Sequence, residues 1–169
     1  MRRPQPACPL KPRLARSGLS NLHPVQIAHE RDDRIKRLAG KIDRVLVDSP
    51  CSGLGTLRRN PDLKWRQSPQ SVDELRLKQA AILASAARLV KPGGRLVYAT
   101  CSLLQSENEA IADAFSAERL RDFKPMAVDS LLEDAHVVQA GTLVSGPYLR
   151  LWPHRHGTDG FFAAVWQRA

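Results

Sequence analysis

Two cysteines lie in polar turns, each of which follows a short apolar segment rich in β-branched residues. Cys51 comes soon after the segment 42–47, and Cys101 comes soon after the segment 95–99. A buried cysteine usually acts as a small apolar residue, but a polar turn after a strand is a poor place for packing. Because a cysteine thiolate is a strong nucleophile, we consider Cys51 and Cys101 to be candidate reactive thiols.

The cysteine pattern favours neither a disulfide framework nor a metal site. The chain has three cysteines, an odd number, and no apolar signal segment follows its basic N-terminus. It has no Cys-x-x-Cys pair, and its histidines are not spaced for zinc, so we expect no metal. The third cysteine, Cys8, lies in the proline-rich segment 1–10, which we expect to be irregular, and is interpreted as a packing residue.

Other residues beside Cys51 allow more than one interpretation. Asp48 ends the apolar segment, where it could hydrogen-bond its own turn or present an acid to a substrate base or a cofactor amine. Gly53 and Gly55 could form a turn that approaches a ligand closely, although two glycines at this spacing are a weak signal. The Gly-rich segment 91–94 comes before a strand, so we interpret it as the end of a helix and a turn.

A basic cluster surrounds an aromatic residue downstream of Cys51. It consists of Arg58, Arg59, Lys64, Trp65 and Arg66. Basic side chains beside an aromatic ring suit phosphate contacts and base stacking, although the same residues could form a solvated loop. The net charge of +9 favours a polyanionic partner, most commonly nucleic acid, over a charge that serves solubility alone.

The elements that position these residues alternate between strands and helices. We expect buried strands at 42–47 and 95–99, joined by a helix that begins at the capping box Ser71-x-x-Glu74 and ends at 91–94. A second capping box, Ser106-x-x-Glu109, predicts a helix to about Phe115. We also expect a helix at 10–17, a charged surface loop or short helix at 29–40, and strands at 25–28, 135–139, 148–152 and 161–167.

This order of elements predicts an α/β fold. We expect a mostly parallel sheet with helices on both faces and a C-terminal antiparallel strand. Because ligands bind outside the carboxyl ends of the strands in such a sheet, Cys51 and Cys101 should face one cleft.

The segments 48–62 and 98–109 resemble two signature motifs of the Nop/Sun-type RNA (cytosine-5)-methyltransferases, and most closely the bacterial RsmB/Sun branch. The resemblance rests on Pro-Cys-Ser-Gly at 50–53 and Thr-Cys-Ser at 100–102, with further matches at Gln79, 91–94 and 156–162. It covers roughly residues 11–168. It implies a partial Rossmann-like class I methyltransferase fold, in which residues 11–169 form the C-terminal part of the catalytic domain.

The resemblance also implies a covalent mechanism with S-adenosylmethionine as the methyl donor. Cys101 would attack carbon 6 of cytosine, Cys51 would assist the elimination that frees the product, and Asp48 would hydrogen-bond the cytosine ring. Asp48 and Pro50 are also expected at the cofactor, with Glu30 as the counterpart of an adenine-binding acid. The expected partner is RNA, ribosomal RNA before transfer RNA, in the cytoplasm.

Family members carry further segments that this sequence does not show. These are an N-terminal RNA-binding region, a first strand, a Gly-rich loop with a lysine, and an acid that binds the ribose. A second hypothesis is therefore an inactive, truncated homologue that binds RNA through its basic surface. A thiol-based redox protein or hydrolase is disfavoured, because the sequence has no nucleophile-elbow motif. A membrane protein is also not expected, since no apolar run approaches bilayer length.

Overall fold

The computed structural model describes residues 10–169, so the expectations for Cys8 and the segment 1–9 lie outside the described residues. The strands are β1 (Ile42–Asp48), β2 (Val90–Thr100), β3 (Phe123–Met126), β4 (Val144–Ser145), β5 (Tyr148–Leu151) and β6 (Phe161–Arg168). The α-helices are α1 (Leu10–Ser17), α2 (Asp33–Lys36), α3 (Leu63–Arg66), α4 (Pro69–Ala87), α5 (Glu109–Glu118), α6 (Val128–Asp134) and α7 (Pro153–His156). Short 3-10 helices are η1 (Leu54–Thr56), η2 (Gln105–Glu107) and η3 (Ala140–Leu143).

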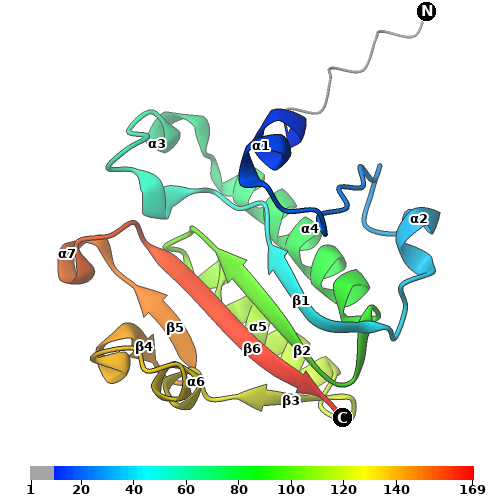
Figure 1. Ribbon diagram of the computed structural model, residues 1–169. Helices are drawn as coiled ribbons and strands as arrows, with labels where there is room; N and C mark the ends of the chain where they lie inside the picture. The colour runs from blue at the N-terminus through cyan, green and yellow to red at the C-terminus, as the bar shows by residue number, and fades with distance from the viewer. Residues whose placement is uncertain (1–9) are drawn as a thin grey trace, which may run out of the picture.

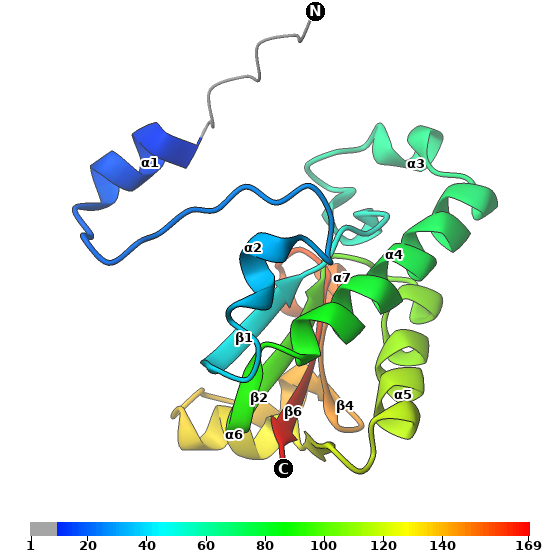
Figure 2. The same ribbon diagram turned by 90° about the vertical axis from the view of Figure 1, so that its right-hand side faces the viewer.

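The described strands form one open sheet in the order β1-β2-β6-β5-β4, with β3 paired to β6. The α/β class is confirmed, and β6 is antiparallel to β2 as expected for the C-terminal strand. Among the described strands, only β1 and β2 pair in parallel. Helix α4 forms the crossover connection that parallel neighbours require. The pairings of β6 with β3 and β5, and of β4 with β5, are antiparallel. Figures 1 and 2 show α4 and α5 on one face of the sheet and α6 on the other.

The main core lies between the sheet and the helices α4 and α5. Its buried side chains include Leu83, Leu96, Tyr98, Ala112, Phe115, Phe162, Ala164 and Trp166. The polar ends of the buried aromatic residues have partners, since the Tyr98 hydroxyl donates to the Glu107 carbonyl at 2.7 Å. This core holds the end of β2 firmly against η2, directly below the turn that carries Cys101.

Helix α4 begins one turn earlier than the sequence predicts. Its N-cap is Ser68, whose hydroxyl accepts from the Ser71 amide while the Ser71 hydroxyl accepts from the Ser68 amide. The predicted box at Ser71-x-x-Glu74 is therefore wrong, because Pro69 has the backbone angle that suits a first helical residue and lets the helix start there. The helix also ends at Ala87, before the segment 91–94, which lies inside β2 where the β1–β2 register shifts.

Three other local expectations are wrong. Ser106 does not cap α5, because 105–107 forms η2 and the N-cap is the buried Asn108. The segment 135–139 is not a strand, since His136 and Gln139 adopt positive φ angles of 56° and 58° that interrupt extended backbone. The segment 25–28 is not paired as a strand, and its Ala28 amide donates to the Asp32 side chain instead.

The remaining elements occur where they were expected. Helix α1 matches 10–17, and the short helix α2 lies within the charged segment 29–40. The strands β1, β5 and β6 match 42–47, 148–152 and 161–167, and β2 contains 95–99. Among residues 10–169, no helix combines the length and the apolar character that crossing a membrane requires.

Candidate functional site

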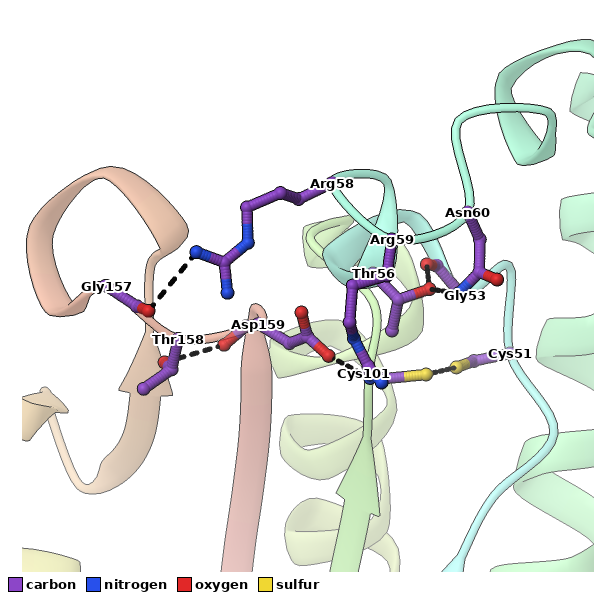
Figure 3. A network of polar contacts seen from close by, with 10 residues as sticks. All are labelled: Cys51, Gly53, Thr56, Arg58, Arg59, Asn60, Cys101, Gly157, Thr158 and Asp159. Carbon is purple, nitrogen blue, oxygen red and sulfur yellow. Dashed lines mark hydrogen bonds and ion pairs between the residues drawn. The ribbon is translucent and has the colours of Figure 1, made fainter.

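The parallel strands β1 and β2 bring Cys51 and Cys101 to the same edge of the sheet. Asp48 pairs with Ala99 at the ends of the strands, and the Ser49 amide donates to the Ala99 carbonyl at 2.9 Å. Each chain then turns, and the sulfur atoms of Cys51 and Cys101 come within 3.5 Å of each other (Figure 3). Both cysteines are half-buried and neither is in a disulfide.

The contact between the two thiols separates their pKa values. Because the Cys51 thiol donates to Cys101, the pKa of Cys101 falls to about 7 even though burial opposes this change. The same contact, together with burial and the charge on Cys101, raises the pKa of Cys51 far above the usual range for a thiol. The pair therefore loses its first proton near pH 7, and above that pH Cys101 carries the thiolate while Cys51 keeps its proton.

Gly55 connects the two cysteine turns to the start of β6. Its amide donates to the Cys101 carbonyl and its carbonyl accepts from the Gly160 amide, both at 2.8 Å. A Cβ atom on Gly55 would lie 2.4 Å from the Gly160 oxygen and 2.6 Å from the Cys101 oxygen. The close approach that Gly55 allows is thus to the protein's own backbone rather than to a ligand.

A buried carboxylate, which the sequence reasoning did not identify, lies beneath both cysteine turns. Glu107 is fully buried and accepts hydrogen bonds from Ser52, from Ser102 and from Gln79 of α4. A signal for this contact exists in the sequence, since Gln79 falls on the otherwise apolar face of the helix that includes Leu75 and Ile82.

Asp48 and Glu30 line one cavity of about 770 Å³ beside β1. Its other walls are largely apolar and include Ile27, Val45, Val47, Leu77 and Ile82. An apolar wall with two carboxylates suits a flat heterocycle that carries amine or hydroxyl donors, so these residues fit the adenosyl part of a nucleoside cofactor. Pro50 is not among the lining residues, and its carbonyl accepts from Gln79 at 3.0 Å.

The predicted basic cluster is divided in two. Arg59 pairs with Asp159, and Arg58 donates to the Gly157 carbonyl, so both arginines hold the loop between α7 and β6 (Figure 3). Lys64, Trp65 and Arg66 lie together on α3 and face solvent, with 80% of Trp65 exposed and the Lys64 ammonium 4.8 Å from its ring centre. Arg66 also pairs with Asp62.

Within the described part of the chain, no group of three or more His, Cys, Asp or Glu side chains is arranged to hold a metal ion. At this edge the Glu107 carboxylate accepts hydrogen bonds, and the two thiols contact each other.

Comparison with known proteins places the chain among methyltransferases. Residues 10–167 match the family model described as 16S rRNA methyltransferase RsmB/F. A Synechocystis protein named probable ribosomal RNA small subunit methyltransferase B is 44% identical over 128 residues, which are 76% of this chain and 28% of that protein. The chain spans less than a third of the length of these curated relatives, which include two Mycobacterium tuberculosis proteins named putative methyltransferase.

Two crystal structures have a similar fold. The structure of PH0851 superposes with a TM-score of 0.80 at 35% identity. The superposed region is 93% of this chain and 33% of the PH0851 chain. The structure of NSun6 from Pyrococcus horikoshii with SFG superposes with a TM-score of 0.69 at 25% identity. The superposed region is 94% of this chain and 38% of the NSun6 chain.

The shared proton predicts how the thiols react. Because the thiolate is the reactive form, alkylation of Cys101 by iodoacetamide should rise with pH and reach half its maximal rate near pH 7. In Cys51→Ala the donor is lost, so the Cys101 pKa should move up toward about 8.5, and the rate at pH 7 should fall about tenfold. Mass spectrometry of the alkylated peptides measures both. In denaturant, wild type and variant should react alike. Identical profiles for the two folded proteins would contradict the coupling.

Proposed function

Because the chain belongs to the family of 16S rRNA methyltransferases RsmB/F, we propose that it is the catalytic part of an S-adenosylmethionine-dependent enzyme that methylates carbon 5 of cytosine in ribosomal RNA. The observation that carries this proposal is the 3.5 Å contact between the two thiols at the edge where β1 and β2 end. Carbon 5 of cytosine is a weak nucleophile. A two-thiol site supplies one thiolate to attack carbon 6 and a second thiol to remove the proton from carbon 5.

In the first proposed step, the Cys101 thiolate forms a bond to carbon 6 of cytosine. The electron pair of the double bond between carbons 5 and 6 shifts toward carbon 5, so that carbon 5 becomes nucleophilic. S-adenosylmethionine, when bound, supplies the electrophilic methyl group that carbon 5 takes. Asp48, which is exposed at the end of β1 and close enough for its charge to act on Cys101, is proposed to orient the ring by hydrogen bonding.

In the second proposed step, Cys51 removes the proton from carbon 5. Once Cys101 is bonded to carbon it no longer carries a charge or accepts the Cys51 proton, so two causes of the high Cys51 pKa are removed. Cys51 can then release its proton to solvent and act as a base. The electron pair of the carbon–hydrogen bond restores the double bond, and Cys101 leaves as a thiolate. One proton is released per methyl transfer, and both cysteines return to their starting states.

The cavity beside β1 is proposed to hold the adenosyl part of the cofactor. Its apolar wall would contact the adenine ring, and Glu30 and Asp48 would accept hydrogen bonds from it or from the ribose. Pro50 would act indirectly, since its carbonyl bond to Gln79 fixes the turn between the cavity and Cys51.

The exposed side chains of α3 are proposed to bind the RNA. Lys64 and Arg66 would contact phosphates, and Trp65 would stack on a base, because an aromatic ring exposed to 80% beside two cations has no packing role. Arg58 and Arg59 would act mainly through the loop before β6 that they hold. Figure 1 shows α3 and α7 at the edge of the sheet where β1 and β2 end, so RNA bound there would lie beside the thiols.

The assignment of the two cysteines predicts a trapped intermediate. With labelled S-adenosylmethionine and small-subunit ribosomal RNA, Cys101→Ala should abolish methyl transfer, because no thiolate can attack carbon 6. Cys51→Ala should instead accumulate an RNA–protein adduct that survives a denaturing gel, because attack proceeds and elimination does not. The double variant, as the control, should give no adduct. Unchanged turnover in Cys51→Ala would show that the roles are wrong. RNA binding without transfer by the wild type would indicate an inactive homologue.

The assignment of α3 predicts a localised loss of RNA affinity. Trp65→Ala should weaken binding of a ribosomal RNA fragment about tenfold, the loss expected for one stacked base. Lys64→Ala should reduce the slope of log affinity against log salt by about 1, because one phosphate contact is lost. Fluorescence anisotropy measures both. The matched controls are Leu120→Ala and Lys124→Ala, which remove an exposed apolar and an exposed basic side chain elsewhere. Equal losses in variants and controls would refute this surface.

A further inference from the structure

Glu107 connects the turns that carry the two cysteines. Its carboxylate accepts from the Ser52 amide at 2.9 Å and from the hydroxyls of both Ser52 and Ser102. Ser52 directly follows Cys51, and Ser102 directly follows Cys101. The same carboxylate is therefore bonded to the residue after each thiol, and the two serine hydroxyls also contact each other at 3.1 Å.

Neighbouring elements fix Glu107 in turn. Gln79 of α4 donates to the Glu107 carboxylate at 2.9 Å and to the Pro50 carbonyl at 3.0 Å. The next residue, Asn108, donates to the Ser102 carbonyl at 3.0 Å and accepts from the Thr100 hydroxyl. Thr100, Ser102, Glu107 and Asn108 are all fully buried, so water cannot replace these partners.

We propose that Glu107 is a positioning residue that sets the distance between the two thiols, and through it the hydrogen bond between Cys51 and Cys101. Only its importance for methyl transfer rests on the proposed function, because the thiol geometry can be measured without RNA or cofactor. A carboxylate is the side chain this position requires, because Ser52, Ser102 and Gln79 all donate hydrogen bonds to it. An amide would turn its own donors toward one of them.

The charge of Glu107 and its positioning act on Cys101 in opposite directions. Its negative charge, like that of Asp48, disfavours the Cys101 thiolate and raises its pKa, whereas the Cys51 hydrogen bond lowers it and is the larger effect. Other charged groups near the cysteine turns are Asp159 and Arg59, whose pKa is raised by the Asp159 carboxylate that it binds and, to a smaller extent, by the charge on Cys101. Arg150 donates to the Leu103 carbonyl and pairs with Glu109. If Glu107 acted only as a charge, removing it would lower the Cys101 pKa. If it positions the thiols, removing it will raise that pKa.

Glu107→Gln tests the proposal in the isolated chain. We expect the pH at which alkylation of Cys101 is half-maximal to rise by about one unit from about 7, toward the value of an ordinary thiol. We also expect diamide, a two-electron thiol oxidant, to form the Cys51–Cys101 disulfide about tenfold more slowly, because even small displacements of reacting atoms have large effects on rate. Mass spectrometry follows both reactions, and circular dichroism monitors the fold.

The matched control is Glu118→Gln, which removes the same charge at the far end of α5, where the exposed carboxylate pairs with Arg119 instead. It should leave both thiol measurements unchanged. A second variant, Gln79→Met, keeps the carboxylate but removes one of its donors, and should raise the Cys101 pKa by a smaller amount.

A folded Glu107→Gln protein with a lowered or unchanged Cys101 pKa would overturn the proposal, as would an equal shift in Glu118→Gln. If Glu107→Gln does not fold, an unchanged profile in Gln79→Met overturns it. Failure of the wild-type chain to methylate RNA, with the thiol results as expected, would count against the proposed function and leave the role of Glu107 intact.

Discussion

The parallel pairing of β1 with β2 is the constraint on which the site depends. Because parallel strands end at the same edge of a sheet, Asp48 lies opposite Ala99, and the turns that follow begin side by side. An antiparallel pairing would place the two cysteines at opposite edges. The crossover that makes the pairing parallel is α4, and the same helix carries Gln79 beneath both turns. One element therefore determines the direction of the strands and supplies a contact to the site they create.

Much of this arrangement could be predicted from local sequence, and the remainder depends on contacts between distant residues. The apolar, β-branched segments identified β1 and the end of β2, and polar turns after them identified Cys51 and Cys101. The capping box of α4 lies at Ser68 rather than at Ser71, because Pro69 lets the helix start earlier. The box expected at Ser106 does not form, because 105–107 is the 3-10 helix η2 and α5 begins after Asn108. Glu107 was not identified, since its partners come from α4 and from both turns.

Several residues that look like ligand contacts in the sequence instead hold the site together. Gly55 approaches the backbone of Cys101 and Gly160 rather than a ligand, and a side chain there would separate the three segments. Arg59 is bound to Asp159 in the loop before β6. Buried Arg150 donates to the Leu103 carbonyl at 2.8 Å, in the turn after Cys101. Connections of this kind restrict the motion of the cysteine turns, and a reactive pair can only work if its spacing is held.

The two cysteines are chemically identical side chains, so their different roles must come from their surroundings. Asp48 and Glu107 both disfavour a negative charge at Cys101, and no cation is hydrogen-bonded to its sulfur among the described contacts. The thiolate is favoured by the hydrogen bond that Cys51 donates to it. Burial raises the pKa of both thiols. At Cys51 this adds to the effect of the contact, and at Cys101 it opposes that effect. In the proposed mechanism, the choice of nucleophile is set by where the proton rests. That preference needs a thiolate at Cys101, so bonding Cys101 to carbon would remove it. The contact would thus prepare the first thiol for attack, and its loss would free the second thiol to act as a base.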